Sequence, residues 1–263
     1  HTAASVSVTT GTTDFGANVI GTRRVVGAAL DRDLPCVALS SLEAIMTPGK
    51  PTTESSPIAE SKTHYGRSKA EAEHWVRARQ AEGARIASLY PSGVIGPDDP
   101  GMSESVKAYR SFLRGTLGVG GTQLVDVRDL AVLIVRLLET GHAGPVIAAG
   151  HFLTWPQMNE TLRRVTGATI STIPGPGWLL RLGARGLDLV GRLTGRKMPM
   201  TGEGIAIATR WQPVDDSAVV AELGVRWRPA EDTLTDLFSW FVEVGRLPAK
   251  AVPTLAAKTD AGA

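Results

Sequence analysis

An alternation of helical and strand-like segments between residues 18 and 90 constrains the fold more than any other feature of this sequence. One helical segment has apolar positions spaced to pack on a sheet, and the other is rich in Ala, Glu and Arg. The strand-like segments are short and almost wholly apolar, as buried parallel strands are. The expected elements are helix 18–30, strand 35–41, helix 65–82 and strand 85–90. We therefore predict an α/β fold built on a doubly wound parallel sheet.

Polar residues gather where these strands are expected to end. Ser41 and the turn Pro91–Gly93 follow strands, and Tyr65 opens the second helix. Ligands of open parallel sheets bind at the carboxyl ends of the strands. Tyr65 and Lys69 are four residues apart and so share one helix face, where the ammonium would lower the pKa of the phenol toward neutrality. A phenol tuned in this way can exchange a proton with an alcohol or carbonyl oxygen. The alternative is a chance pair on a solvated helix, which the position at the strand ends disfavours.

Composition excludes several classes of protein. Hydrophobic residues make up 43% and charged residues 21% of the 263 residues, which is ordinary for a globular protein. The net charge is +2 and Lys and Arg form no dense block, so we expect no nucleic-acid partner. The one cysteine, Cys36, lies in an apolar run and is interpreted as a small buried hydrophobe. The histidines show no ligand spacing, so no metal site is expected. Without a membrane-length apolar run or a signal peptide, we expect a cytoplasmic protein.

Six short motifs occur in one order along most of the chain. They are His1–Ala4, Asn18–Thr22, Leu39–Ser41, Tyr65–Lys69, Tyr90–Pro97 and Val125–Ala131. In these motifs the chain resembles the extended (atypical) short-chain dehydrogenases/reductases of the NAD-dependent epimerase/dehydratase superfamily, in particular the dihydroflavonol-reductase-like members. The resemblance implies a Rossmann-like core with a smaller α/β substrate lobe.

The resemblance also implies roles for single residues. Tyr65 would exchange the proton with the substrate oxygen, Lys69 would hold the nicotinamide ribose, and Ser41 would hydrogen-bond the same substrate oxygen. The Ser40–Ser41 doublet leaves the register of the catalytic serine open by one residue. The cofactor would be NAD or NADP. The residues implied to contact it are Ala3, Ala4, Ser40, Tyr65, Lys69, Tyr90, Pro91, Ser92 and Gly93.

One part of the family pattern is missing from the sequence. No Gly-x-x-Gly-x-x-Gly motif follows an amino-terminal strand, although the family uses that turn to hold the cofactor's pyrophosphate. We therefore expect a core truncated at its amino end. Its predicted parts are a partial dinucleotide-binding core over residues 1–150, with lobe elements from about residue 97, a substrate lobe over 151–247 and a disordered tail over 248–263.

Three functions remain open at this point. The first is an NAD(P)-dependent oxidoreductase for a hydrophobic alcohol or carbonyl compound, the second a nucleotide-sugar epimerase or dehydratase, and the third a non-catalytic remnant unable to bind cofactor. Asn18 and Asp129 are interpreted as helix caps rather than catalytic groups. Residues 178–193 form an apolar and a basic stripe, interpreted as a lobe helix with a core face and solvated arginines; contact with a membrane surface is the alternative. The resemblance implies a homodimer through the helices that begin near Asn18 and Tyr65.

Overall fold

The computed structural model describes residues 1–2, 16–47, 49–61, 64–194 and 202–261, in two compact units. Unit 1 comprises His1–Ser92, Val127–Gly150 and Gln212–Trp227, and unit 2 comprises Gly93–Asp126, His151–Trp211 and Arg228–Ala263. The chain thus passes between the units several times. Within the range predicted for the substrate lobe, Gln212–Trp227 belongs to unit 1.

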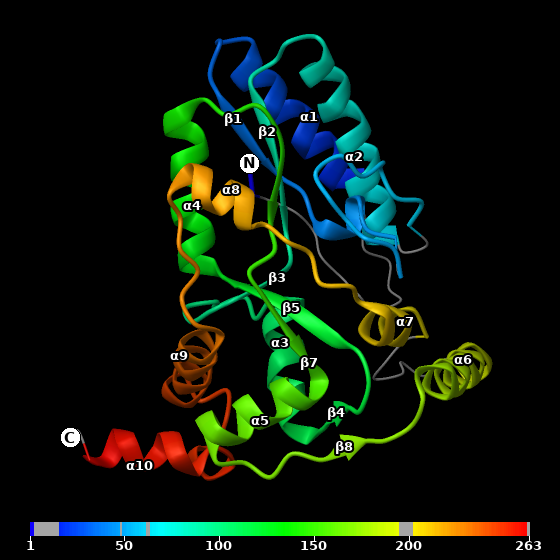
Figure 1. Ribbon diagram of the computed structural model, residues 1–263, viewed down its shortest axis with the longest axis vertical. Helices are drawn as coiled ribbons and strands as arrows, with labels where there is room; N and C mark the ends of the chain where they lie inside the picture. The colour runs from blue at the N-terminus through cyan, green and yellow to red at the C-terminus, as the bar shows by residue number, and fades with distance from the viewer. Residues whose placement is uncertain (3–15, 48, 62–63, 195–201, 262–263) are drawn as a thin grey trace. The chain divides into compact units, whose positions relative to one another are not determined.

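Unit 1 is an α/β unit around a parallel sheet, as predicted. Its strands β1 (Cys36–Leu39), β2 (Ile86–Pro91) and β6 (Gly144–Ala148) pair in the order β1-β2-β6, and both pairs are parallel. Helices α1 (Gly16–Leu30) and α2 (His64–Ala81) lie on one side of the sheet, and α4 (Val127–Thr140) lies on the other, next to α8 (Ser217–Leu223) (Figure 1). This layering covers both faces of the sheet, as parallel sheets require.

Apolar packing explains why these elements form where the sequence predicts them. Every residue of β2 is buried, and Val26 of α1, Cys36 of β1 and Val76 of α2 pack in one cluster with it. Cys36 is a free, buried cysteine, which confirms its interpretation as a small hydrophobe. Burial raises the pKa of its thiol. At the other end of α2, Gly83 adopts a φ of +90°, which ends the helix at the predicted place.

Unit 2 is built around a sheet with the order β3-β5-β7, in which β5 (Gly121–Asp126) pairs parallel with β3 (Gly93–Ile95) and antiparallel with β7 (His151–Thr154). A short ribbon joins β4 (Thr116–Leu117) to β8 (Thr172–Ile173). The remaining elements of the unit are α3 (Glu104–Ser111), η2 (Phe112–Arg114), α5 (Trp155–Thr166), α6 (Gly177–Thr194), α7 (Gly202–Arg210), α9 (Ala230–Glu243), η3 (Ala249–Ala251) and α10 (Pro253–Ala261).

The core of unit 2 lies between its sheet and helices α5 and α9. Leu234, Leu237, Phe238 and Phe241 of α9 are fully buried there. A capping box begins α5, because the side chains of Thr154 and Gln157 each hydrogen-bond the other residue's main chain. Among the described residues, no helix is long and apolar enough to cross a membrane.

The carboxyl-terminal segment corrects one prediction. Residues 248–263 were expected to be disordered, but η3 and α10 form there, as far as residue 261. Val252 and Leu255 are buried in the core of unit 2. These two apolar side chains anchor the carboxyl-terminal segment, although the stretch is otherwise rich in Pro, Ala and Lys. They do so because unit 2 provides the apolar surface against which they pack.

The core face of α6 is formed by other residues than the predicted apolar stripe. Trp178, Leu179 and Leu182 are exposed, with 61% of Trp178 accessible to solvent. Of the described side chains of α6, Ala184 is buried and Leu180 is partly buried against the core of unit 2, and α6 packs chiefly on α7. The apolar stripe of α6 is therefore a surface feature of unit 2. Its proposed contact with a membrane stays a prediction.

Gly120 is required by the packing of unit 2, and its replacement gives a first prediction. Its φ is +92°, and a Cβ there would overlap the main-chain oxygen of Ala208 on α7. We expect Gly120→Ala to lower the free energy of unfolding by about 2–3 kcal/mol, measured by urea denaturation. Gly141→Ala is the matched control, because Gly141 also has a positive φ, +62°, but open space around it. The control should cost only about 1 kcal/mol, and equal losses in both variants would show that no clash occurs.

Candidate active site

Tyr65 and Lys69 lie in the first turns of α2, at the carboxyl end of β1. The Lys69 Nζ is 5.9 Å from the centroid of the Tyr65 ring and donates a hydrogen bond to the Leu39 carbonyl oxygen at 3.0 Å. Lys69 is buried, with 8% of its surface exposed, whereas Tyr65 is half-buried. The spacing of four residues therefore places both side chains together, as the helix geometry predicts.

Ser41 lies beside this pair. It follows β1 as the cap of η1 (Leu42–Ala44), where its Oγ accepts a hydrogen bond from the Glu43 amide at 3.2 Å. The Ser41 side chain also hydrogen-bonds the Tyr65 hydroxyl, which lowers the pKa of that tyrosine. Ser40 instead uses its main-chain amide to bond the Leu89 oxygen across the sheet. Of the two serines, Ser41 is the one that reaches Tyr65.

The electrostatics of the pair differ from the prediction. Burial, reinforced by the Glu43 carboxylate, raises the pKa of Tyr65 to about 12 in spite of the Ser41 hydrogen bond. Burial also lowers the pKa of Lys69 to about 8, although the Glu73 carboxylate opposes this change. The expected tuning of the phenol toward neutrality is therefore wrong for this structure, because loss of water outweighs the neighbouring ammonium. At neutral pH Tyr65 is a protonated phenol, which suits it to donate a proton.

Asn18 positions the start of α2 and does not cap α1. The helix α1 begins two residues earlier, at Gly16, and Asn18 is buried inside it. Its Nδ2 donates to the Ser68 Oγ at 3.2 Å, and the Ser68 Oγ donates to the Tyr65 main-chain oxygen at 2.7 Å. These two bonds connect α1 to the main chain of Tyr65. An asparagine among the apolar positions of a helix indicates a buried polar contact, but we interpreted Asn18 as a helix cap from the sequence.

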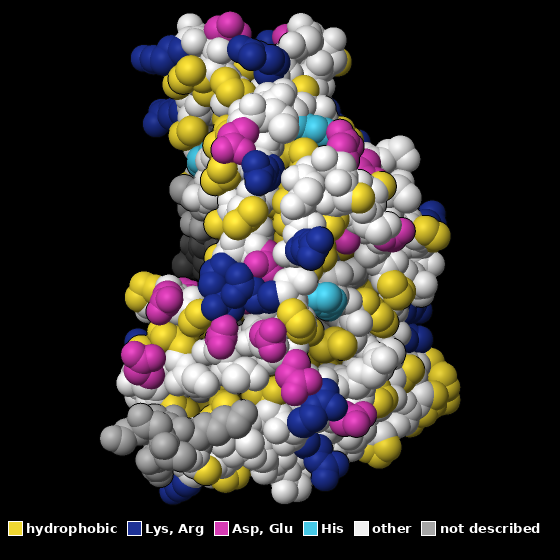
Figure 2. Space-filling model, turned by 60° about the vertical axis from the view of Figure 1, so that its left-hand side comes forward, with side chains coloured by type: hydrophobic (Ala, Val, Ile, Leu, Met, Phe, Trp, Pro, Cys, Tyr) yellow, Lys and Arg dark blue, Asp and Glu magenta, His cyan; other side chains and the backbone are white. Residues whose placement is uncertain are grey.

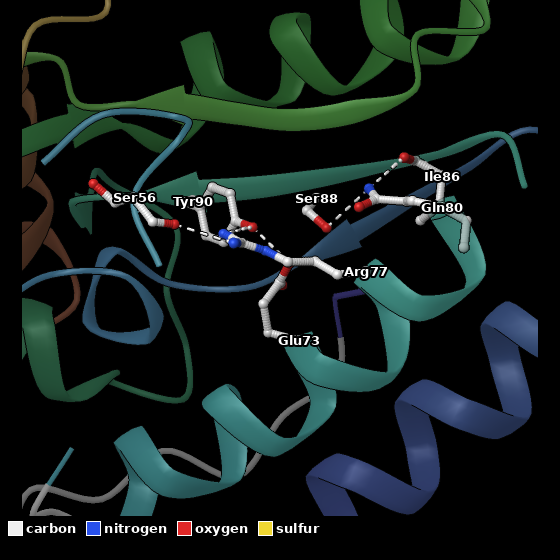
Figure 3. Close-up of polar contacts among 7 residues, drawn as sticks. All are labelled: Ser56, Glu73, Arg77, Gln80, Ile86, Ser88 and Tyr90. Atoms are coloured by element: carbon white, nitrogen blue, oxygen red, sulfur yellow. Dashed lines mark hydrogen bonds and ion pairs between the residues drawn. The ribbon is translucent and has the colours of Figure 1, made fainter. Parts of the chain in front are cut away.

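The side chain of Tyr90 belongs to a buried network that holds α2 on β2 (Figure 3). Its hydroxyl donates to the Glu73 Oε1 at 2.5 Å and accepts from the Arg77 Nη2 at 3.1 Å. Arg77 also pairs with Glu73 at 3.3 Å and donates to the Ser56 oxygen. Burial and the Glu73 carboxylate raise the pKa of Tyr90. The phenol of Tyr90 is thus engaged inside unit 1 and is not available to a cofactor.

The other residues predicted to bind cofactor are placed as follows. Ser92 is the last residue of the first segment of unit 1. Its Oγ donates to the Ala149 oxygen at 2.7 Å, and its amide donates to the Ala148 oxygen. Pro91 is buried at the end of β2, and Gly93 begins β3 in unit 2. The Pro91–Ser92 turn is thereby tied to the end of β6. Ala3 and Ala4 lie outside the described residues.

Two aspartates mark the start of α4. Asp129 was expected to cap this helix but lies inside its first turn and is buried, where a carboxylate stabilises the helix amino terminus. Asp126, which directly precedes α4 in the chain, is buried and forms an ion pair with the partly exposed Arg228 at 3.5 Å within unit 2. The sequence did not indicate this pair, because 102 positions separate its members along the numbering, Asp126 to Arg228.

The described residues fit one end of a nicotinamide dinucleotide. Tyr65, Lys69 and Ser41 provide hydroxyl and ammonium groups at a strand end, as a ribose and a reacting oxygen require. Gly115, Gly118 and Gly121 have the glycine spacing used for a pyrophosphate, but they lie along β4 and the start of β5 instead of at a strand–helix turn. In the described part of the chain, the pyrophosphate end therefore has no glycine-rich turn.

Comparison with known proteins identifies the family. A family model described as the NAD dependent epimerase/dehydratase family matches residues 1–150, more than half of the chain. The chain belongs to this family. The match covers β1, β2 and the Ser41, Tyr65 and Lys69 group, and it confirms the resemblance in the six motifs.

A relative and two solved structures are similar to most of this chain. A Synechocystis sp. protein named "Putative dihydroflavonol 4-reductase" is 27% identical over 261 residues, covering 88% of this chain and 71% of the relative. The crystal structure of gox2253 is 25% identical with a TM-score of 0.70, covering 88% of this chain and 73% of that one. The Thermus thermophilus UDP-glucose 4-epimerase complex with NAD is 20% identical with a TM-score of 0.66, covering 92% and 76%. The last likeness supports the Rossmann-type fold alone.

Proposed function

We propose that this protein is an NAD(P)-dependent oxidoreductase that interconverts a carbonyl and an alcohol on a hydrophobic small molecule. The observation that carries the proposal is the meeting of Ser41, Tyr65 and Lys69 at the end of β1. A hydroxyl, a phenol and an ammonium in one partly buried group suit proton transfer at a substrate oxygen. The named Synechocystis relative, more similar to this chain than the epimerase structure, supports a reductase.

In the reductive direction, the Tyr65 phenol donates its proton to the carbonyl oxygen, and the Ser41 hydroxyl holds that oxygen by a second hydrogen bond. The high pKa of Tyr65 keeps the phenol protonated and ready to donate at neutral pH. Lys69, with its pKa lowered to about 8, is able to return a proton to Tyr65 near physiological pH. The cofactor, when bound, supplies the hydride. Lys69 and Tyr65 would hold the nicotinamide ribose.

The substrate class and the assembly belong to the same proposal. Unit 2 exposes Trp178, Leu179 and Leu182 along α6, which supports an apolar ligand. On α1, Ile20 and Val25 are exposed, which supports a homodimer formed through α1 and α2. The nucleotide-sugar epimerase or dehydratase remains the second candidate, favoured by the description of the family itself.

Cofactor binding tests the proposal before any substrate is known. We expect NADH or NADPH to raise the melting temperature of the full chain by at least about 5 °C at a concentration a hundred times the Kd. We then expect the absorbance of the preferred reduced cofactor at 340 nm to fall when apolar aldehydes or ketones are added. No thermal shift with either cofactor at millimolar concentration, in a chain shown to be folded by circular dichroism, would instead support the non-catalytic remnant. Turnover of a UDP-sugar without net cofactor consumption would support the epimerase.

A further inference from the structure

Unit 2 contains an open pocket of about 730 Å³ whose charged lining is wholly basic. Its lining includes five cationic side chains and neither aspartate nor glutamate. The cations are Lys107, Arg110, Arg114, Arg246 and Lys250. On the face of the molecule shown in Figure 2, by contrast, basic and acidic side chains are interspersed. The pocket is therefore a local concentration of one charge in a chain whose net charge is only +2.

Two segments far apart in the sequence build this pocket. Lys107, Arg110 and Arg114 come from α3 and η2, whereas Arg246 and Lys250 follow α9. The Nη1 of Arg110 donates to the main-chain oxygen of Arg246 at 3.4 Å, which joins the two segments. Gly167 and Thr169, just after α5, and Pro253, at the start of α10, also line the pocket. Folding of unit 2 thus brings the like charges together.

Local partners neutralise only part of this charge. Lys107 forms an ion pair with Glu104 at 2.9 Å, which leaves four cations. The pocket lies at the carboxyl-terminal ends of three helical segments, α3 with η2, α5 and α9, and each end carries about half a negative charge. A surplus of roughly two to three positive charges therefore remains. Among the described residues, Arg110, Arg114, Arg246 and Lys250 have no ion-pair partner.

We propose that this pocket is a binding site for a small phosphate-bearing dianion or trianion, such as pyrophosphate or a phosphate ester. The guanidinium groups of three arginines present planar pairs of donors that match phosphate oxygens. The remaining positive charge matches the two to three negative charges of such a ligand. The pocket's volume is in the range of small-molecule sites, and its exposed side chains leave it open to solvent. The site is formed by unit 2 alone and is independent of the proposed oxidoreductase activity.

Titration with inorganic pyrophosphate tests the site, with isothermal calorimetry on the full chain at low ionic strength and without nicotinamide cofactor. We expect submillimolar binding that weakens as salt is added. The double variant Arg110→Gln/Arg246→Gln should weaken binding at least tenfold. Arg24→Gln is the matched control, because Arg24 is an exposed arginine of α1 in unit 1. The control should bind as the unchanged chain does.

Three results would overturn the proposal. The first is the absence of binding at 10 mM pyrophosphate, a concentration roughly a hundred times a Kd of about 0.1 mM. The second is unchanged binding in the double variant, and the third is equal weakening in Arg24→Gln. Circular dichroism checks the fold of each variant. If the double variant does not fold, the single change Lys250→Gln, at an exposed position of η3, should weaken binding severalfold; an unchanged Kd there also rejects the site. Because the titration contains no cofactor, none of these results depends on the oxidoreductase proposal.

Discussion

Replacing Tyr65 by phenylalanine should lower kcat by about 10³-fold while changing the free energy of unfolding by only about 1 kcal/mol. The substitution removes the proton donor but keeps the ring. The stability loss is small because the lost bond to Ser41 is offset by the desolvation cost that the buried hydroxyl no longer carries, as the raised pKa of Tyr65 indicates. Initial rates at 340 nm with the preferred cofactor and a reducible ketone measure kcat, and urea denaturation measures stability.

Tyr109→Phe is the matched control for this experiment. It removes one hydroxyl from a buried tyrosine, but Tyr109 lies on α3 in unit 2 and has no part in the proposed site. We expect its kcat to stay within twofold of the unchanged chain, and its stability to change by no more than about 1 kcal/mol. Turnover retained in Tyr65→Phe, or lost equally in both variants, would remove Tyr65 from the chemical step.

Replacing Lys69 by methionine should abolish most turnover and yet stabilise the protein at neutral pH. Burial lowers the pKa of Lys69 to about 8, so keeping the ammonium charged in the folded chain costs up to about 3 kcal/mol at pH 7. The variant loses the hydrogen bond to the Leu39 oxygen and the attraction to Glu73, which offset part of this gain. We expect a net increase of about 1–2 kcal/mol in the free energy of unfolding, with kcat lowered at least about 10²-fold.

The pH dependence of stability distinguishes this explanation from simple packing. Between about pH 8 and pH 10 the unfolded chain keeps the Lys69 proton that the folded chain has released, so the free energy of unfolding rises with pH. The methionine variant lacks this rise, and its advantage should shrink from pH 7 to pH 9.5. The raised pKa of Tyr65 acts in the opposite direction, but only above about pH 10. Urea denaturation at pH 7.0, 8.0 and 9.5 provides the measurement.

The matched control is Lys50→Met, at an exposed position, which should change stability by less than about 0.5 kcal/mol at every pH. A Lys69→Met variant that is less stable than the unchanged chain at pH 7, with a difference independent of pH, would mean that the bond to Leu39 outweighs the cost of burying the charge.

Features with a local cause were predictable from the sequence. The order of α1, β1, α2 and β2 follows from apolar spacing and from Gly83, because each depends on residues within one or two turns of each other. The capping box of α5 and the shared face of Tyr65 and Lys69 have the same local origin. The family likewise follows from short motifs, each made of neighbouring residues.

Features that depend on distant segments were missed or misplaced. The strands β3, β5 and β7 are short, β3 and β5 each begin at a glycine, and all three are strands because they pair with one another across unit 2. The tail is ordered because unit 2 offers Val252 and Leu255 a place to pack. The basic pocket exists because α3 and the segment after α9 meet, 136 residues apart at Arg110 and Arg246.

The site itself shows the same division. The sequence by itself determined that Tyr65 and Lys69 share one face of α2 and that Ser41 follows β1, because helix and strand geometry are local. Only the tertiary structure decided which serine meets Tyr65, how Asn18 supports α2, and that the pKa of Tyr65 rises instead of falling. The physical reason is that desolvation depends on every segment that covers a group, and that cover is created only when the chain folds.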